Sequence, residues 1–288
     1  MVGSFYELEG KTFLICVGAM RCATSWIHRY LASLPGVAVS PIKEVHYFNA
    51  KFPTNALSDA DVLALKRLGL QAGRTGNPVD NLLLEPVFQA SIDRAQMIYD
   101  DEAYFGHFAR LCAPETFALC DITPAYAVIG RPGFQYMKNF VAAQGLRVKI
   151  LFLMRDPLDR LWSQLRHMQH LNPAAAVATR WPEAIRSAPI MARADYRATI
   201  EDLDATFFAR DILYLFYEDL FTEASLRRLS HFIGADHWPG NTDERANASM
   251  LEQGLPEGAR EAFLDALAPQ YAFCRDRFDG QVPACWAA

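Results

Sequence analysis

The sequence predicts an α/β protein of three layers, in which a central parallel sheet is flanked by helices. Three nearly continuous apolar runs carry this prediction: TFLICV at residues 12–17, VKILFLM at 148–154 and ILYLFY at 212–217. Runs rich in β-formers and without polar alternation are typical of strands that are covered on both faces, as in parallel sheets. Two weaker strands are expected at residues 37–39 and 117–121.

A helical pattern follows each of the first two strong strands. Apolar residues recur at the i, i+3, i+4 and i+7 positions of residues 27–34 and again of residues 158–165. This spacing indicates amphipathic helices, and strands that alternate with helices favour a parallel sheet.

Length and composition predict one domain over residues 1–288, because a chain of this size with 51% hydrophobic residues can bury one large core. Residues 50–113 are more polar and helical in pattern, broken by GRTGNPVDN at 73–81, and are expected to form a mostly helical insertion. Residues 222–288 predict a helical C-terminal region with boundaries at Pro256 and Pro269.

The charge balance, 28 basic against 33 acidic residues, argues against a broad cationic face for nucleic acid. Acidic residues precede the first apolar run, unlike in a signal peptide, and no run of about 18 apolar residues occurs. A cytoplasmic protein without a membrane span is expected.

The six cysteines form no CxxC pair, which disfavours a zinc site, while a bridge between Cys274 and Cys285 stays an open alternative. The oligomeric state is left open.

The segment GAMRCATSW at residues 18–26 follows the first strand and opens the first helix. Such a turn directs backbone N–H groups and a helix dipole at one point, which suits a phosphate. Compared with the P-loop pattern G-x-x-x-x-G-K-[ST], Gly18 and Ser25 fit, Ala23 replaces glycine and Thr24 replaces lysine. The fold is therefore P-loop-like, with Arg21 supplying the basic group. The alternative is an ordinary connection in which Thr24 or Ser25 caps the helix.

The second strong strand ends at Arg155, and Asp156 and Pro157 are suited to the N-cap and first position of a helix. Open parallel sheets bind ligands at the carboxyl ends of their strands. Arg155 and Ser163 are therefore expected to converge on one phosphate. The alternative is an ion pair between Arg155 and Asp156 beside a solvated serine.

Taken together, these segments resemble the PAPS-dependent sulfotransferases, where PAPS is 3′-phosphoadenosine 5′-phosphosulfate. Residues 18–26 resemble the 5′-phosphosulfate loop, and RDPLDRLWS at 155–163 resembles the 3′-phosphate motif R-D-P-x-x-R-x-x-S. KEVHYF at 43–48 and TPAY at 123–126 are similar to K-E-V-H-F-F and T-P-A-Y of heparan sulfate 3-O-sulfotransferases. With YEDL at 217–220, the resemblance covers residues 12–220, in the same order as in the family, which also has bacterial members.

The resemblance implies in-line transfer of a sulfuryl group from PAPS to a hydroxyl or amine of a small-molecule or carbohydrate acceptor, with PAP (adenosine 3′,5′-bisphosphate) as product and no metal. Arg21, at the position of the family's catalytic lysine, would bind the bridging oxygen and 5′-phosphate. Glu44 would be the general base, with His46 as the fallback. Donor binding would involve Arg21, Cys22, Ala23, Thr24, Ser25, Trp26, Arg155 and Ser163, with adenine stacked on Trp26.

Three positions depart from the family pattern: Ala23 for glycine, Asn49 for aspartate and Ile122 for lysine. The last two argue against a highly sulfated polysaccharide acceptor, and the sequence leaves the acceptor open.

A P-loop kinase or triphosphatase is the rival enzyme class. Thr24 argues against it, because it stands where the P-loop pattern has lysine. A non-catalytic nucleotide-binding protein is the third alternative.

Overall fold

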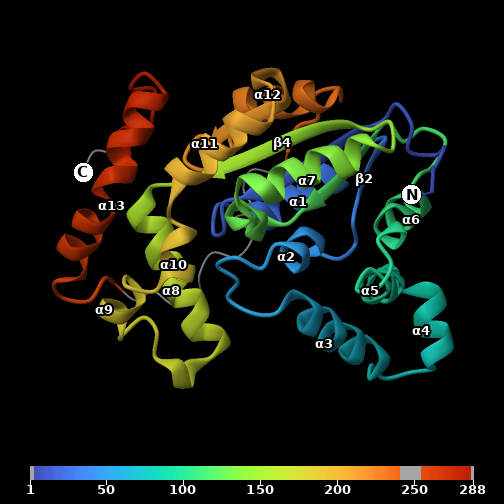
Figure 1. Cartoon of the computed structure of the whole chain (residues 1–288), viewed down its shortest axis with the longest axis horizontal. Helices are drawn as coiled ribbons and strands as arrows, with labels where there is room; N and C mark the ends of the chain where they lie inside the picture. Colours follow the sequence, from blue (N-terminus) through green and yellow to red (C-terminus); the bar gives the residue numbers. More distant parts are fainter. Residues whose placement is uncertain (1–2, 241–253, 287–288) are drawn as a thin grey trace.

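A five-stranded, wholly parallel sheet forms the centre of the computed structural model, which describes residues 3–240 and 254–286 (Figure 1). Its strands lie in the order β2-β3-β1-β4-β5. They are β1 (Thr12–Gly18), β2 (Val37–Val39), β3 (Ala118–Ile122), β4 (Arg147–Met154) and β5 (Ile212–Phe216). The three strong strands and the two weaker ones are confirmed, and so is the three-layer α/β fold.

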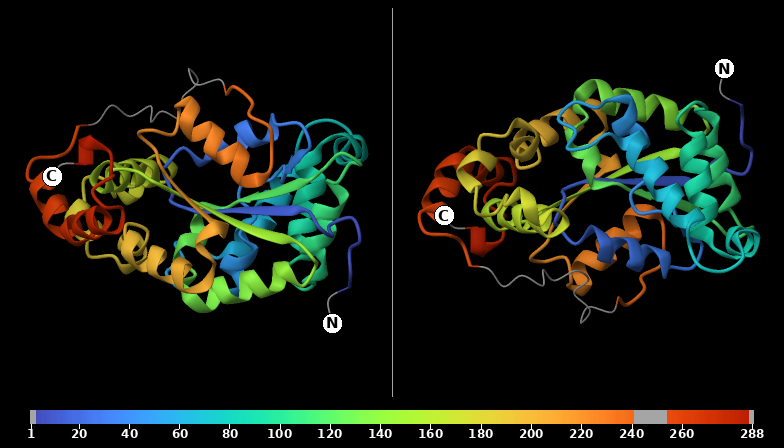
Figure 2. Two further views of the ribbon diagram at one scale, coloured as in Figure 1. Left: turned by 90° about the horizontal axis from the view of Figure 1, so that it is seen from above. Right: turned by 90° about the horizontal axis from the view of Figure 1, so that it is seen from below.

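Helices cover both faces of the sheet. Figure 2 shows α1 (Thr24–Ala32) and α12 (Glu223–Ile233) over one face, and α7 (Gly130–Ala142) and α11 (Tyr196–Thr206) over the other. The strands are buried on both sides for this reason, as the apolar runs of the sequence predict: every residue of β1 is buried.

The segment between β2 and β3 is helical. It contains α2 (Tyr47–Lys51), α3 (Ala60–Ala72), α4 (Pro78–Leu84), α5 (Pro86–Gln96) and α6 (Glu102–Arg110). Tyr104 and Phe108 of α6 pack on Phe13 of β1, with ring centroids 6.1 and 4.7 Å apart, so α6 adds an aromatic cluster to the core of the sheet. Helices α3 and α4 lie further from the sheet (Figure 1).

Beyond β4 the chain is mostly helical, with β5 completing the sheet. The elements not yet named are α8 (Pro157–Leu171), α9 (Trp181–Ala184), α10 (Ala188–Ala192), α13 (Ala259–Arg277) and the 3-10 turns η1 (Pro124–Val128), η2 (Pro173–Ala175), η3 (Ala209–Asp211) and η4 (Ala284–Trp286). Of the predicted C-terminal region, residues 241–253 and 287–288 lie outside the described residues. In the ranges that the structure describes, no helix has the length and apolar character needed to cross a bilayer.

The expected boundary at Pro269 is wrong, and the open question of a C-terminal disulfide is answered. Helix α13 continues through Pro269, although proline removes one hydrogen bond and crowds the preceding turn, because buried residues on both sides, such as Leu267 and Tyr271, pack the helix against the protein. The bridge between Cys274 and Cys285 is not formed: both thiols are free, with Cys274 on the buried face of α13 and Cys285 exposed.

Buried Asp121, in β3, anchors a hydroxyl network beneath the site described below. Its Oδ2 accepts hydrogen bonds from Tyr104 (3.0 Å) and Tyr126 (2.9 Å), and its Oδ1 accepts one from Thr123 (2.6 Å). Burial raises the pKa of Asp121 although these three hydroxyls favour its ionised form.

We predict that Asp121→Ala lowers the free energy of unfolding by about 3–5 kcal/mol, because three buried hydroxyl donors lose their common acceptor. Urea denaturation measures the change. Glu201→Ala, which removes an exposed pair with Arg197, serves as the control and should change stability by less than about 1 kcal/mol. Equal effects of the two substitutions would contradict the role given to Asp121.

Candidate active site

The two strand–loop–helix turns meet at the carboxyl ends of β1 and β4. Arg21, in the loop after β1, donates from Nε to Oγ of Ser163 on α8, over 3.1 Å. Residues 142 positions apart in the chain are thus in contact, because β1 and β4 are neighbours in the sheet. This contact brings the two segments together, while the convergence of Arg155 and Ser163 on one phosphate stays a prediction.

The backbone of the first loop is shaped to bind an anion. Arg21 and Ala23 have φ of 70° and 59°, in the left-handed region that suits glycine. In the described part of the chain, the N–H groups of residues 21–25 donate to no backbone carbonyl. Ala23 is the N-cap of α1 without a side-chain cap, so the alternative in which Thr24 or Ser25 caps the helix is wrong. Free N–H groups at a helix start are a binding site for phosphate-like groups.

Close packing fixes the start of this loop. A Cβ on Gly18 would lie 2.6 Å from Cε2 of Phe152 in β4, so only glycine fits. Cys22 is buried, and burial raises the pKa of its thiol to about 12, which leaves it an inert part of the loop.

Positive charge is concentrated around Arg21. Burial lowers the pKa of Arg21, and the neighbouring guanidinium groups of Arg155 and Arg166 lower it further. Arg155 lies over the ring of Tyr217, with its Cζ 4.7 Å from the ring centroid, and its Nη2 is 3.6 Å from Asp159. A bound anion would relieve the repulsion among these like charges.

The second loop is braced by its neighbours. Asp156 caps α8 by accepting from the Asp159 N–H (3.0 Å), as predicted, and its Oδ atoms accept from Tyr271. The Asp156 N–H donates to Glu218, and the Arg155 backbone N–H and C=O both bond to the Tyr196 hydroxyl. The alternative pairing of Arg155 with Asp156 is therefore not observed.

Buried Arg160 and half-buried Arg155 keep hydrogen-bonding capacity for a ligand. Arg160 is 0% exposed and donates from Nη1 to Gln164 over 2.7 Å. Its Nε and Nη2, and the Nε of Arg155, are buried without a hydrogen-bond partner among the described residues. Buried donors of this kind are normally paired, so the site fits a ligand rich in acceptor oxygens.

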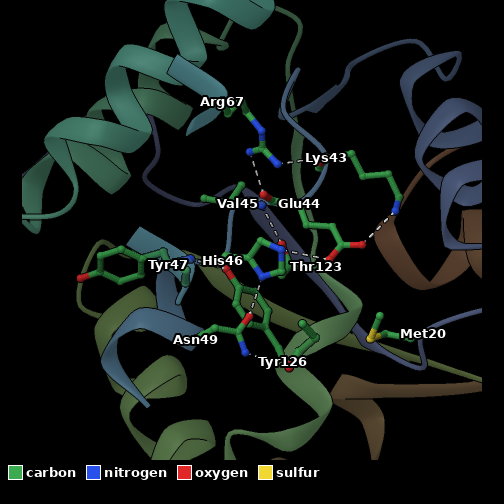
Figure 3. Close-up of polar contacts among 12 residues, drawn as sticks. Met20, Lys43, Glu44, Val45, His46, Tyr47, Asn49, Arg67, Thr123 and Tyr126 are labelled. Atoms are coloured by element: carbon green, nitrogen blue, oxygen red, sulfur yellow. Dashed lines mark hydrogen bonds and ion pairs between the residues drawn. The ribbon is translucent and has the colours of Figure 1, made fainter. Parts of the chain in front are cut away.

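Glu44 lies at the centre of a short chain of polar contacts (Figure 3). Its carboxylate is 3.3 Å from the Nζ of Lys43 and 3.2 Å from the Nε2 of His46, and the side chain is 21% exposed. Burial alone would raise the pKa of Glu44, but the hydrogen bond from His46 and the charge of Lys43 lower it to about 2. The stabilisation from these pairs is thus present above the ordinary carboxyl value of 4.5 and is lost as the pH falls toward 2.

His46 is held by Asn49, the residue that departs from the family's aspartate. Asn49 donates from Nδ2 to the Ala125 carbonyl (2.8 Å), which leaves its Oδ1 as the acceptor for His46 Nδ1 at 3.0 Å. The Nε2 of His46 therefore faces Glu44 in a fixed orientation (Figure 3).

Sequence reasoning missed several groups near the site. His167 lies one helical turn beyond Ser163 on α8, a spacing that could have indicated it. Burial lowers the pKa of His167, as does the charge of Arg21, while Glu44 acts in the opposite direction.

Arg193 is a second group that sequence reasoning missed. It donates from Nε to the Sδ of Met20 (3.1 Å), and burial, with Arg160 nearby, lowers its pKa to about 10. Arg193 comes from a distant loop, and no local pattern marks it.

Trp26 is placed mainly in the core. Its indole is 4% exposed and stacks on Tyr30 with ring centroids 5.3 Å apart, while Phe221 meets it edge-on. Stacking of adenine on Trp26 stays a prediction.

The two hydroxyl residues of the first loop lie at the start of α1, where Thr24 is buried and Ser25 is half-buried. Across residues 3–240 and 254–286, no group of three or more His, Cys, Asp or Glu side chains is arranged to hold a metal ion.

The chain is a parallel α/β protein in which two strand–loop–helix turns meet at the carboxyl ends of neighbouring strands. A statistical description of the sulfotransferase family matches residues 14–240. The chain belongs to the sulfotransferase family. No curated protein sequence gives a significant match.

Three solved sulfotransferase structures are matched, and the first of them is similar in fold. A sulfotransferase from Alicyclobacillus acidocaldarius has a TM-score of 0.64 at 19% identity, over 96% of this chain and 99% of that one. The sulfotransferase domain of the Synechococcus PCC 7002 olefin synthase has a TM-score of 0.40 at 17% identity, over 91% of this chain and 94% of the domain. The sulfotransferase domain of the curacin biosynthetic pathway has a TM-score of 0.38 at 14% identity, over 91% of this chain and 98% of the domain.

The left-handed backbone of Ala23 leads to a stability prediction. Ala23→Gly should raise the free energy of unfolding by about 0.5–1 kcal/mol, because glycine adopts this conformation without a Cβ clash. Ala266→Gly, in the exposed middle of α13, is the control and should lower stability by about 1 kcal/mol. Thermal denaturation of both variants measures the difference, and a loss of stability in Ala23→Gly would show that strain at Ala23 is not relieved.

Proposed function

We propose that the protein transfers the sulfuryl group of PAPS to a hydroxyl or amine of a small-molecule or carbohydrate acceptor. The observation that carries the proposal is the contact between Arg21 and Ser163 beside Arg155, since it joins the two segments that resemble the phosphate motifs of the family. Membership of the sulfotransferase family supports the reaction class.

The donor would lie across the two loops. The N–H groups of residues 21–25 and the side chain of Arg21 would bind the 5′-phosphosulfate, with Thr24 and Ser25 completing the cradle. Arg155 and Ser163 would bind the 3′-phosphate through charge-assisted hydrogen bonds. The unpartnered buried Nε of Arg155 supports this assignment.

Transfer would proceed in line. A bond forms between the acceptor oxygen or nitrogen and sulfur, while the bond between sulfur and the bridging oxygen breaks and leaves the electron pair on the 5′-phosphate of PAP. Positioning and charge stabilisation dominate such transfers. Arg21 would stabilise the charge that develops on the leaving oxygen, and because a guanidinium keeps its proton, this role is electrostatic.

Glu44 would accept the proton that the acceptor loses. Each of its carboxylate oxygens makes one of the contacts described above and retains a second lone pair for an acceptor group. A weakly basic carboxylate is suited to a proton that leaves late, when bonding to sulfur has already made the attacking group acidic. His46 would orient Glu44, and it is the alternative base.

The first experiment measures transfer of labelled sulfate from PAPS to a panel of phenols, sugars and hydroxylated or amino metabolites, with EDTA present. Turnover should persist in EDTA, because the charge on the leaving oxygen is already met by Arg21. Turnover of ATP that requires magnesium, without transfer from PAPS, would instead indicate the kinase or triphosphatase alternative. Nucleotide binding without any transfer would indicate a non-catalytic protein.

With an acceptor in hand, Glu44→Gln should lower kcat by about 10²–10⁴-fold, because the amide keeps the shape of the side chain but cannot take the proton. PAP affinity, measured by calorimetry, should change little. Glu115→Gln, at an exposed glutamate, is the control and should leave turnover unchanged. Near-normal turnover in Glu44→Gln would rule out Glu44 as the base, and a larger loss in His46→Ala would exchange the two roles.

A further inference from the structure

The backbone that carries Glu44 is held by an arginine of α3, a helix outside the motifs discussed so far. Arg67 donates from Nη1 to the carbonyl of Glu44 (3.1 Å) and from Nη2 to the carbonyl of Lys43 (3.4 Å) (Figure 3). One guanidinium thus spans two consecutive peptide groups at the candidate base. Burial lowers the pKa of Arg67, and the nearby negative charge of Glu44 acts in the opposite direction. The guanidinium of Arg67 and the carboxylate of Glu44 therefore interact electrostatically.

A second arginine continues the pattern from α5. Arg94 is 1% exposed, and its Nε donates to the carbonyl of Val45 over 2.6 Å. Its Nη2 is fixed in turn by Asp61 of α3 at 2.8 Å. The carbonyls of three consecutive residues, 43 to 45, are therefore bound by side chains of the helices between β2 and β3.

The sheet holds the same segment from the other side. The Val45 N–H donates to Oγ1 of Thr123 (2.9 Å), and the Tyr47 N–H donates to the hydroxyl of Tyr126 (3.1 Å). Both acceptors are fixed by Asp121. The segment has bonds to rigid elements on both sides, which leaves its backbone little freedom to turn.

A buried Ser–His–Asp chain anchors the segment upstream. His107 of α6 is 2.9 Å from Oγ of Ser40 through Nε2 and 2.9 Å from Asp93 through Nδ1. This is the connectivity of a nucleophilic triad, but Ser40 is only 1% exposed and no substrate can reach it. The chain therefore serves to fix the end of β2, where the segment begins.

From these contacts we infer that Arg67 is a positioning residue for catalysis, which holds the backbone of Lys43 and Glu44 so that the Glu44 carboxylate is presented to the acceptor. The inference rests on the proposed function and makes α3 a part of the catalytic apparatus. Arg67 is the informative member of the pair, because it bonds directly to the Glu44 peptide and is half-buried, whereas Arg94 is locked in the core. A small displacement of a catalytic group lowers the rate steeply.

The test compares Arg67→Ala with Lys66→Ala, which removes the neighbouring, exposed positive charge from the same helix. Arg67→Ala should lower kcat about 10–100-fold and leave PAP affinity unchanged. Lys66→Ala should leave both unchanged, and Arg67→Lys should recover part of the rate, since one ammonium can reach one of the two carbonyls. In a Glu44→Gln background, Arg67→Ala should have no further effect on kcat, because Arg67 acts through Glu44.

Hydrogen exchange of residues 43–48 supplies a readout that does not depend on turnover. Amide exchange in this segment should speed up in Arg67→Ala and stay unchanged in Lys66→Ala. Unchanged exchange, or normal kcat in Arg67→Ala while Glu44→Gln is impaired, would overturn the inference and leave the proposed function standing. If the wild-type protein transfers no sulfate from PAPS, the proposed function fails instead, and a positioning role in that reaction fails with it.

Discussion

The hydrogen bond between Arg21 and Ser163 joins the two loops and holds Arg21 near other guanidinium groups in a half-buried site, and the rest of the site is arranged around that contact. Arg21 lies close enough to Arg155 and Arg166 for each to lower its pKa. Like charges placed together in a partly desolvated site favour an anionic ligand over an empty state. The left-handed backbone of the first loop, which turns its N–H groups to the same place, adds to this preference.

The fold positions two parts of the site independently: the loops with Arg21 and Arg155, and the segment with Glu44. The carboxyl edge of the parallel sheet positions the two loops proposed to bind the donor, with Tyr217, Glu218 and Tyr196 bracing the second of them. The segment with Glu44 is positioned separately, between the hydroxyl network of Asp121 and the arginines of α3 and α5. Rigid support for both parts would favour the proposed in-line transfer, because such a reaction depends on alignment more than on chemical activation.

The sequence predicted the parts whose signals are local. Buried strands appear as apolar runs, so all five strands could be predicted, and the loop with Arg21 and the helix start with Arg155 directly follow two of them. The hydrogen bond between Arg21 and Ser163 was not predicted, because it depends on which strands are neighbours in the sheet. Contacts such as Arg67 with Glu44 depend on how separate helices pack, which no local pattern encodes. The same limit explains Pro269, where the packing of α13 overrides the usual boundary.

The most direct test of this account is calorimetric titration with PAP and with adenosine 5′-monophosphate, which lacks only the 3′-phosphate. If Arg155 and Ser163 form the 3′-phosphate site beside the loop of Arg21, PAP should bind with a micromolar dissociation constant. The monophosphate should bind about 10–100-fold more weakly, the range expected when charge-assisted hydrogen bonds are lost. Equal affinities for the two nucleotides would contradict the account.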